Sequence, residues 1–185
     1  IGVDHLLLLC SHTHAGPALD EPFPSSENPW KKTVEDRILS AMKEAQKEMF
    51  PAFIAAGEGA MTLGYNRLRR DPDGFATTLF ENPERIPIGP VDPTVGVIRI
   101  ADNTGKIRAV VVHYGCHAVV LGPNNLKISA DYVGSMYRTV EKELGNGALC
   151  LFAQGGAGDI NPLFMARGEG HEEDFAPVDK MGEML

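Results

Sequence analysis

The chain has 185 residues, of which 43% are hydrophobic and 23% charged, and its formal net charge at pH 7 is −8. An acidic chain without a basic block is a poor match for nucleic acid or for an anionic membrane surface, because both are bound by positive charge. No apolar run approaches the roughly 20 residues of a membrane-spanning helix, so we expect a folded domain that binds no nucleic acid and has no transmembrane segment.

The first predicted element is a buried strand over residues 5–10, where four leucines precede Cys10. The sequence SHTHAGP (11–17) follows it directly. In open α/β sheets the loops after strands carry the chemistry, and residues i and i+2 of an extended chain point to the same side. We therefore expect His12 and His14 to face one cleft. The alternative is a pair of solvent-exposed loop histidines.

The rest of the chain alternates predicted helices and strands. In chain order we expect a proline-rich loop over 15–31, a helix from Thr33 to about Phe50, a strand over 59–66 leading into Arg67, a turn-rich stretch up to Pro93, a β-hairpin of 95–101 and 107–114, a helix from Asp131 to Gly145, a strand over 148–153, a loop over 154–162 and a helix near Val178. This order predicts an α/β fold, in which a mixed β-sheet is flanked by helices and strand-end loops form the active-site edge.

Three cysteines are too few and too scattered for a disulfide framework. Cys10 and Cys150 lie in apolar runs, which predicts buried thiols. Cys116 adjoins His117, and its simplest interpretation is a small packing residue, with a metal ligand or a nucleophile as the alternatives.

Three predicted strands end in polar loops, and convergence of these loops would bring together His12, His14, His117 and Asp159. A catalytic zinc needs about three protein ligands and an open position for water, whose pKa it lowers to roughly 7. His12 and His117 are the preferred zinc ligands. His113 competes with His117, but its position near the end of a strand favours a packed or hydrogen-bonded histidine.

Two further features have a functional and a structural interpretation. The glycine-rich loop over 155–158 could hold a phosphate or an oxyanion with its backbone N–H groups, or could be a tight turn where two segments pass closely. It lacks the Lys-Ser/Thr ending of a P-loop. Arg67 could bind a carboxylate or an oxyanion, or could be an ordinary surface charge.

Four segments together resemble the neutral/alkaline non-lysosomal ceramidase family. They are SHTHAGP (11–17), GYNR (64–67), GCHAVVLGPNNLKISADYVG (115–134) and FAQGGAGDINP (152–162), and they follow the order of the family. The resemblance implies an α/β catalytic domain that binds one zinc ion and hydrolyses the amide bond of N-acylsphingosines. It also favours a secreted or extracytoplasmic location.

Carried over by position, His12 and His117 match the family's zinc histidines, His14 matches a histidine that faces the substrate, and Arg67 matches an active-site arginine. Asn161 stands where the family has a serine in a Gly-x-x-Ser-Pro pattern. The family's other zinc ligands, a glutamate and a tyrosine, come from later sequence. We therefore expect residues 1–185 to form a single ceramidase-like catalytic domain that is incomplete at both ends.

The leading hypothesis is a zinc-dependent hydrolase that cleaves an N-acyl bond with metal-activated water. His14, Arg67 and Asn161 would stabilise the tetrahedral oxyanion. Its substrate would be a small-molecule or lipid amide, which places the chain in sphingolipid metabolism. Because asparagine cannot act as a nucleophile, a catalytically lapsed relative that binds a lipid or sugar is the second hypothesis. A metal-assisted phosphoesterase that uses the 155–158 loop is the third.

Overall fold

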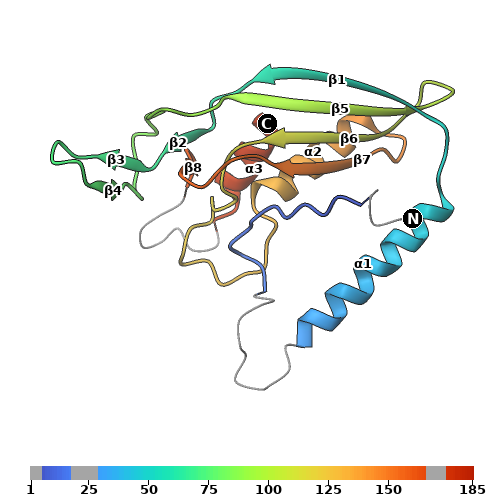
Figure 1. The fold of residues 1–185 in the computed structure, drawn as a ribbon, viewed down its shortest axis with the longest axis horizontal. Coiled ribbons are helices and arrows are strands. Elements are labelled where there is room, and N and C mark those ends of the chain that lie inside the picture. Colours follow the sequence, from blue (N-terminus) through green and yellow to red (C-terminus); the bar gives the residue numbers. More distant parts are fainter. Residues whose placement is uncertain (1–5, 18–28, 166–173) are drawn as a thin grey trace.

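The computed structural model describes residues 6–17, 29–165 and 174–185 (Figure 1). Its centre is a four-stranded sheet in the order β1-β5-β6-β7. Pairing is antiparallel from β1 to β6 and parallel between β6 and β7, so the sheet is mixed. The strands are β1 (Ala52–Ala60), β5 (Thr94–Asp102), β6 (Ile107–Tyr114) and β7 (Leu149–Gln154).

One face of this sheet forms the core together with two helices, α2 (Tyr132–Leu144) and α3 (Ala176–Met184). Side chains alternate between the two faces of a strand, so Val110, Val112 and Tyr114 all point from β6 toward the helices. Met136 of α2 and Met181 of α3 are fully buried between the helices and the sheet. The α/β fold class, with a mixed sheet and flanking helices, is therefore confirmed.

The opposite face of the sheet carries apolar side chains that nothing in the described ranges covers. Ile54, Ile98, Leu149 and Leu151 are each more than 40% exposed. The helix α1 (Pro29–Lys47) also leaves apolar side chains exposed, among them Ile38 and Leu39. In the part of the chain that can be placed, no helix has the length and apolar character needed to span a membrane.

Several predicted elements agree with the structure. The hairpin of β5 and β6 is formed, and α2 begins after Asp131 and ends at Gly145. The strand predicted over 148–153 is β7. The first helix begins at Pro29 rather than at Thr33, consistent with the preference for proline at the first helical position. The helix predicted near Val178 is α3.

The prediction of a buried first strand is wrong for the residues that can be described. Residues 6–10 are not in a strand, and Leu7 is 78% exposed, because no strand or helix within 29–165 or 174–185 packs against this run. Cys10 is exposed for the same reason, against the predicted buried thiol, whereas Cys116 and Cys150 are buried as expected. Residues 1–5, 18–28 and 166–173, where parts of the predicted strand and loops fall, lie outside the described residues.

The sequence patterns also missed four strands. The strand expected over 59–66 covers only the end of the alanine- and glycine-rich β1, whose first seven residues (52–58) were not predicted, and the short β2 (Gly64–Asn66). The hairpin of β3 (Leu68–Arg70) and β4 (Ala76–Thr78) lies in the turn-rich stretch, and β8 (Ile160–Pro162) lies in the predicted loop. A three-residue strand is too short to show a period of two.

The short pair of β2 and β8 positions the site. It is antiparallel, with Tyr65 opposite Asn161, and it lies beyond the ends of β6 and β7 (Figure 1). Residues 115–117 and 155–158 leave the sheet at these same ends. The strand-end loops that were predicted to form an active-site edge thus lie where β6 and β7 meet the β2–β8 pair.

Candidate metal centre

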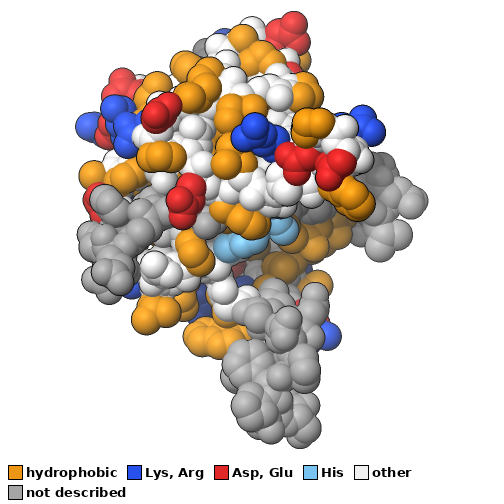
Figure 2. Space-filling view, turned by 90° about the vertical axis from the view of Figure 1, so that its left-hand side faces the viewer, with side chains coloured by type: hydrophobic (Ala, Val, Ile, Leu, Met, Phe, Trp, Pro, Cys, Tyr) orange, Lys and Arg blue, Asp and Glu red, His pale blue; other side chains and the backbone are white. Residues whose placement is uncertain are grey.

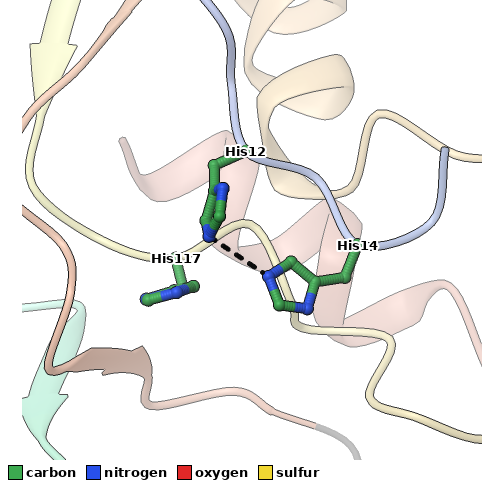
Figure 3. Close-up of side chains that lie close together, drawn as sticks. All are labelled: His12, His14 and His117. Atoms are coloured by element: carbon green, nitrogen blue, oxygen red, sulfur yellow. Dashed lines mark hydrogen bonds between the residues drawn. The ribbon is translucent and has the colours of Figure 1, made fainter. Parts of the chain in front are cut away.

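The three histidines that follow strand ends or the leucine run come together at this edge. One nitrogen of each ring of His12, His14 and His117 lies within 4.8 Å of the others. The ring centroids of His12 and His117 are 4.9 Å apart, and those of His14 and His117 are 5.6 Å apart. Figure 3 shows the rings pointing toward one another from two separate segments of the chain. We call these three residues the histidine triad.

The spacing of His12 and His14 fits two ligands of a tetrahedral metal ion. Two nitrogens that are each 2.0–2.1 Å from one tetrahedral zinc lie about 3.3–3.4 Å apart. The Nε2 atoms of His12 and His14 are 3.3 Å apart and share a hydrogen bond (Figure 3), so the two nitrogens already have the separation of two ligands on one ion. Three imidazoles form a donor set that catalytic zinc sites use, so the residues present fit the group that the sequence predicts.

A backbone carbonyl fixes the orientation of His117. Nδ1 of His117 is 3.1 Å from the Ile160 oxygen, and the His117 backbone N–H donates to the same oxygen at 3.0 Å. Since a carbonyl only accepts, Nδ1 carries the proton and Nε2 keeps its lone pair. Metal-binding histidines are usually held in this way.

His12 reaches the triad by a turn rather than by an extended chain. Its φ of 57° lies in the left-handed region, which non-glycine residues adopt rarely. The expectation that His12 and His14 face one site is therefore met by a different backbone route. The argument from alternating side chains in a strand was wrong.

Arg67 and Asn161 lie next to the triad and contact each other. The Arg67 guanidinium donates to Oδ1 of Asn161 at 3.2 Å and to the Gly158 oxygen at 2.7 Å. The Nδ2 group of Asn161 faces the sulfur of Met165 at 3.6 Å. Asn161 is 1% exposed, so its amide is buried and already engaged on both sides.

Two hollows meet at Arg67. The first, of about 270 Å³, has polar walls from His14, Arg67 and Asn161 and apolar walls from residues such as Phe80 and Met165. The second, of about 480 Å³, is more open and is lined by residues that include His12, His117, Arg67 and Gln154. Figure 2 shows histidine side chains reaching the surface, with hydrophobic side chains around them. A bound molecule in either hollow would contact both the triad and a guanidinium.

The surroundings of the triad favour neutral imidazole. Burial lowers the pKa of His14, and the nearby His12 and Arg67 lower it further, against the opposing charge of Asp131. Burial also lowers the pKa of His117, assisted by Arg67 and His12, although the hydrogen bond to Ile160 opposes this. Because only the neutral ring binds a metal, both rings are prepared for metal binding at pH 7.

These lowered pKa values predict that acid destabilises the metal-free protein. The folded state binds protons less readily at His14 and His117 than the unfolded state does. Stability is therefore present above the unfolded pKa of about 6.5 and is lost as the pH falls through the lower folded values. Urea unfolding in the presence of a chelator between pH 5 and 8 measures this. His117→Ala should weaken the pH dependence, while His113→Ala serves as the control.

Other residues singled out in the sequence lie outside the triad. His113 is exposed on β6, where it packs over Gly96 and Gly155. The Asp159 carboxylate accepts a hydrogen bond of 2.7 Å from Asn66 and is not part of the ligand cluster found among the described residues. Burial raises the pKa of the Cys116 thiol, which suits a packing residue and not a nucleophile.

The glycine-rich loop passes close to another backbone segment. A Cβ on Gly155 would lie 3.0 Å from the Gly115 Cα, and a Cβ on Gly115 would lie 2.9 Å from the Gly156 oxygen. The Gly155 N–H donates to the Tyr114 oxygen. The structural interpretation, a tight turn between close segments, therefore accounts for Gly155 without a phosphate.

Two residues of the site have no sequence signal that would mark them. The Ile160 carbonyl that orients His117 belongs to the backbone, and only the β2–β8 pairing brings it there. Gln154 donates through Nε2 to the Cys116 oxygen at 3.2 Å, while its buried Oε1 has no hydrogen-bond partner among the described residues.

Comparisons with known proteins show what this chain resembles in sequence and in fold. No family model matches the chain. Neutral ceramidase A of Dictyostelium discoideum is 29% identical over 181 residues, which are 94% of this chain and 24% of that protein. The fold is similar to the crystal structure of neutral ceramidase from Pseudomonas aeruginosa, with a TM-score of 0.70, 22% identity and coverage of 92% of this chain and 28% of that one. A second structure, of a ceramidase complexed with C2, gives a TM-score of 0.70 at 20% identity, over 93% of this chain and 28% of that one. The chain thus spans about a quarter of the relatives that it matches.

Proposed function

From the similarity of this chain to the neutral ceramidases in sequence and in fold, we propose that it forms the histidine-bearing part of a zinc-dependent hydrolase that cleaves the amide bond of an N-acyl lipid. The observation that carries this proposal is the histidine triad, in which one ring nitrogen of each residue lies within 4.8 Å of the others. Within it, the 3.3 Å between the Nε2 atoms of His12 and His14 matches the separation of two ligands on one tetrahedral ion. A hollow with one guanidinium and several apolar side chains adjoins the triad and suits an amphiphilic amide.

In this proposal His12 and His117 hold the metal through Nε2. Zinc supplies, when bound, a Lewis acid that acidifies water and polarises a carbonyl. His14 lies on the side of the first hollow and its lowered pKa keeps its ring neutral, so it can accept a proton or serve as a third ligand. The Arg67 guanidinium supplies N–H donors for the oxyanion that forms when the amide carbonyl is attacked.

Asn161 acts on Arg67 in this scheme. Its Oδ1 and the Gly158 oxygen hold two nitrogens of the guanidinium, which aims the remaining donors of the group. The role expected from the sequence, direct donation by the Asn161 amide to the oxyanion, fits the geometry less well because Nδ2 faces Met165. We therefore assign oxyanion stabilisation to Arg67 and orientation of Arg67 to Asn161.

Zinc analysis and amide hydrolysis test the proposal together. We expect the purified full-length protein to contain about one zinc per molecule by elemental analysis and to release fatty acid from an N-acylsphingosine. Removal of zinc with a chelator should abolish this activity, and added zinc should restore it. Hydrolysis of a phosphoester with no activity toward amides would favour the phosphoesterase hypothesis. A protein that neither binds zinc nor cleaves amides would contradict the proposal.

A second candidate is a lapsed enzyme that keeps the pocket without the chemistry. It is favoured because Oδ1 and Nδ2 of Asn161 are already occupied by Arg67 and Met165. A serine at this position would carry a hydroxyl instead of this amide. Asn161→Ser separates the two candidates. New amide hydrolysis in this variant, from an inactive parent that still binds zinc, would support the lapsed enzyme. Activity in the parent protein would exclude it.

A further inference from the structure

The segment before α2 lies against the loop that carries His12 and His14. The Ser129 N–H donates to the Ala15 oxygen at 2.9 Å, and the Thr13 hydroxyl donates to the Ser129 oxygen at 2.9 Å. Thr13 lies between the two histidines in sequence. Two hydrogen bonds to a single residue therefore hold this loop at a fixed place.

The same segment holds the loop that carries His117. The Asp131 carboxylate accepts from the Val120 N–H at 3.0 Å and from the Leu121 N–H at 3.1 Å. The Tyr132 hydroxyl donates to the Cys116 oxygen at 2.8 Å. The backbone is thus held on both sides of His117, by two adjacent residues at the start of α2.

Asp131 links these two sets of contacts. Its own N–H donates to the Ser129 hydroxyl at 3.0 Å, which joins it to the residue that holds the first loop. Its carboxylate is 2% exposed and also accepts from the Tyr132 N–H at 2.8 Å.

The backbone of Asp131 is strained in a way that capping a helix does not require. Helix-capping residues usually adopt the β region, whereas Asp131 has φ 57° and ψ −152°. Strained conformations persist only where the surrounding contacts hold them, and they concentrate at functional sites. Here the strain lets one carboxylate cap α2 and bind the 120–121 backbone at once.

We propose that Asp131 is the positioning residue of the metal centre, which fixes the loop of His14 relative to the loop of His117 through backbone contacts. This inference rests on the proposed function, because it assumes that the histidine triad binds zinc. The residue touches none of the three rings within hydrogen-bond distance, so its effect passes through Ser129 and through the 118–121 loop. The metal affinity of the triad then depends on a side chain outside it.

The substitution Asp131→Asn in the full-length protein tests the proposal. The variant keeps the size of the side chain but replaces one acceptor oxygen by an N–H donor that faces a backbone N–H. We expect zinc affinity, measured by competition with a chromophoric chelator, to fall about 10–100-fold, the effect typical of residues that support metal ligands. The absorption spectrum of the Co²⁺-loaded variant should also change, because it reports ligand geometry.

Asp179→Asn is the matched control. The Asp179 carboxylate accepts from Arg138 at 2.7 Å, on the exposed side of α2 and α3, so this exchange should leave zinc affinity unchanged. Thermal unfolding of the metal-free proteins separates positioning from simple stabilisation. A merely structural role predicts a lower melting temperature for Asp131→Asn with wild-type zinc affinity, and that result would overturn the proposal.

Tyr132→Phe extends the test in case Asp131→Asn does not fold. It removes only the hydroxyl that donates to the Cys116 oxygen, which retains its hydrogen bond from Gln154. We expect about 10-fold weaker zinc binding. Wild-type affinity in a folded Tyr132→Phe protein would count against positioning by this segment. A wild-type protein that binds no zinc would overturn the proposed function and this inference together, whereas tight binding by both wild type and variants would overturn this inference alone.

Discussion

Replacement of His117 by alanine is expected to remove zinc binding and amide hydrolysis together. His117 is the buried member of the triad, and its ring is fixed by the Ile160 carbonyl. Changes outside the ligand set already cost about 10–100-fold in metal affinity, so loss of a ligand should cost more than about 100-fold. Chelator competition measures the affinity, and fatty-acid release measures the activity.

His113→Ala provides the matched control, since it also removes an imidazole from the same stretch of chain but lies outside the triad. We expect it to keep wild-type zinc affinity. His14→Ala then distinguishes the two roles left open for His14. Loss of zinc makes His14 a third ligand, while retained zinc with lost activity makes it a proton acceptor. Wild-type zinc affinity in His117→Ala would show that the metal, if bound, lies elsewhere.

Replacement of Arg67 by methionine is expected to lower kcat with little change in zinc content. The variant keeps the length of the side chain but loses the donors that would face the oxyanion. Removal of one such donor typically costs about 2.7–4 kcal/mol of transition-state stabilisation, or about 10²–10³ in kcat. Steady-state kinetics on a soluble short-chain N-acylsphingosine, with zinc content measured in parallel, provide the test.

Arg108→Met is the control for this experiment. The Arg108 guanidinium lies over the Phe50 ring, 4.5 Å from its centroid, and it pairs with Asp102 of β5. Both residues lie near the start of β6, and the triad lies beyond its other end. We expect this variant to have wild-type kcat. If Arg67→Met changes only KM, Arg67 contributes uniform binding and not stabilisation of the oxyanion.

The sequence predicted much of the site because its chemistry lies in local motifs. His117 follows β6, and the loops after strands of an α/β sheet converge at one edge, whereas His12 and His14 follow a leucine run that forms no strand. Arg67 and Asn161 were singled out by their place in motifs that resemble the ceramidases. The structure brings all five residues together, while their roles in catalysis remain predictions for the experiments above.

What the sequence could not predict depends on contacts between distant segments. The pairing of β2 with β8 involves three residues on each side, too few to show a pattern, yet it determines that Arg67 meets Asn161. Asp131 looks like an ordinary helix cap in the sequence, and only its contacts with residues 120 and 121 show a further task. The leucine run failed as a buried strand because hydrophobicity reports a tendency to be buried, not the presence of a neighbour.

The ladder that joins Tyr65 to Asn161 has a consequence for how this site can evolve. Position 161 is held by main-chain hydrogen bonds of β8, so its location does not depend on which side chain it carries. A different side chain at this position would change the groups that line the first hollow, while the pairing with β2 stays in place.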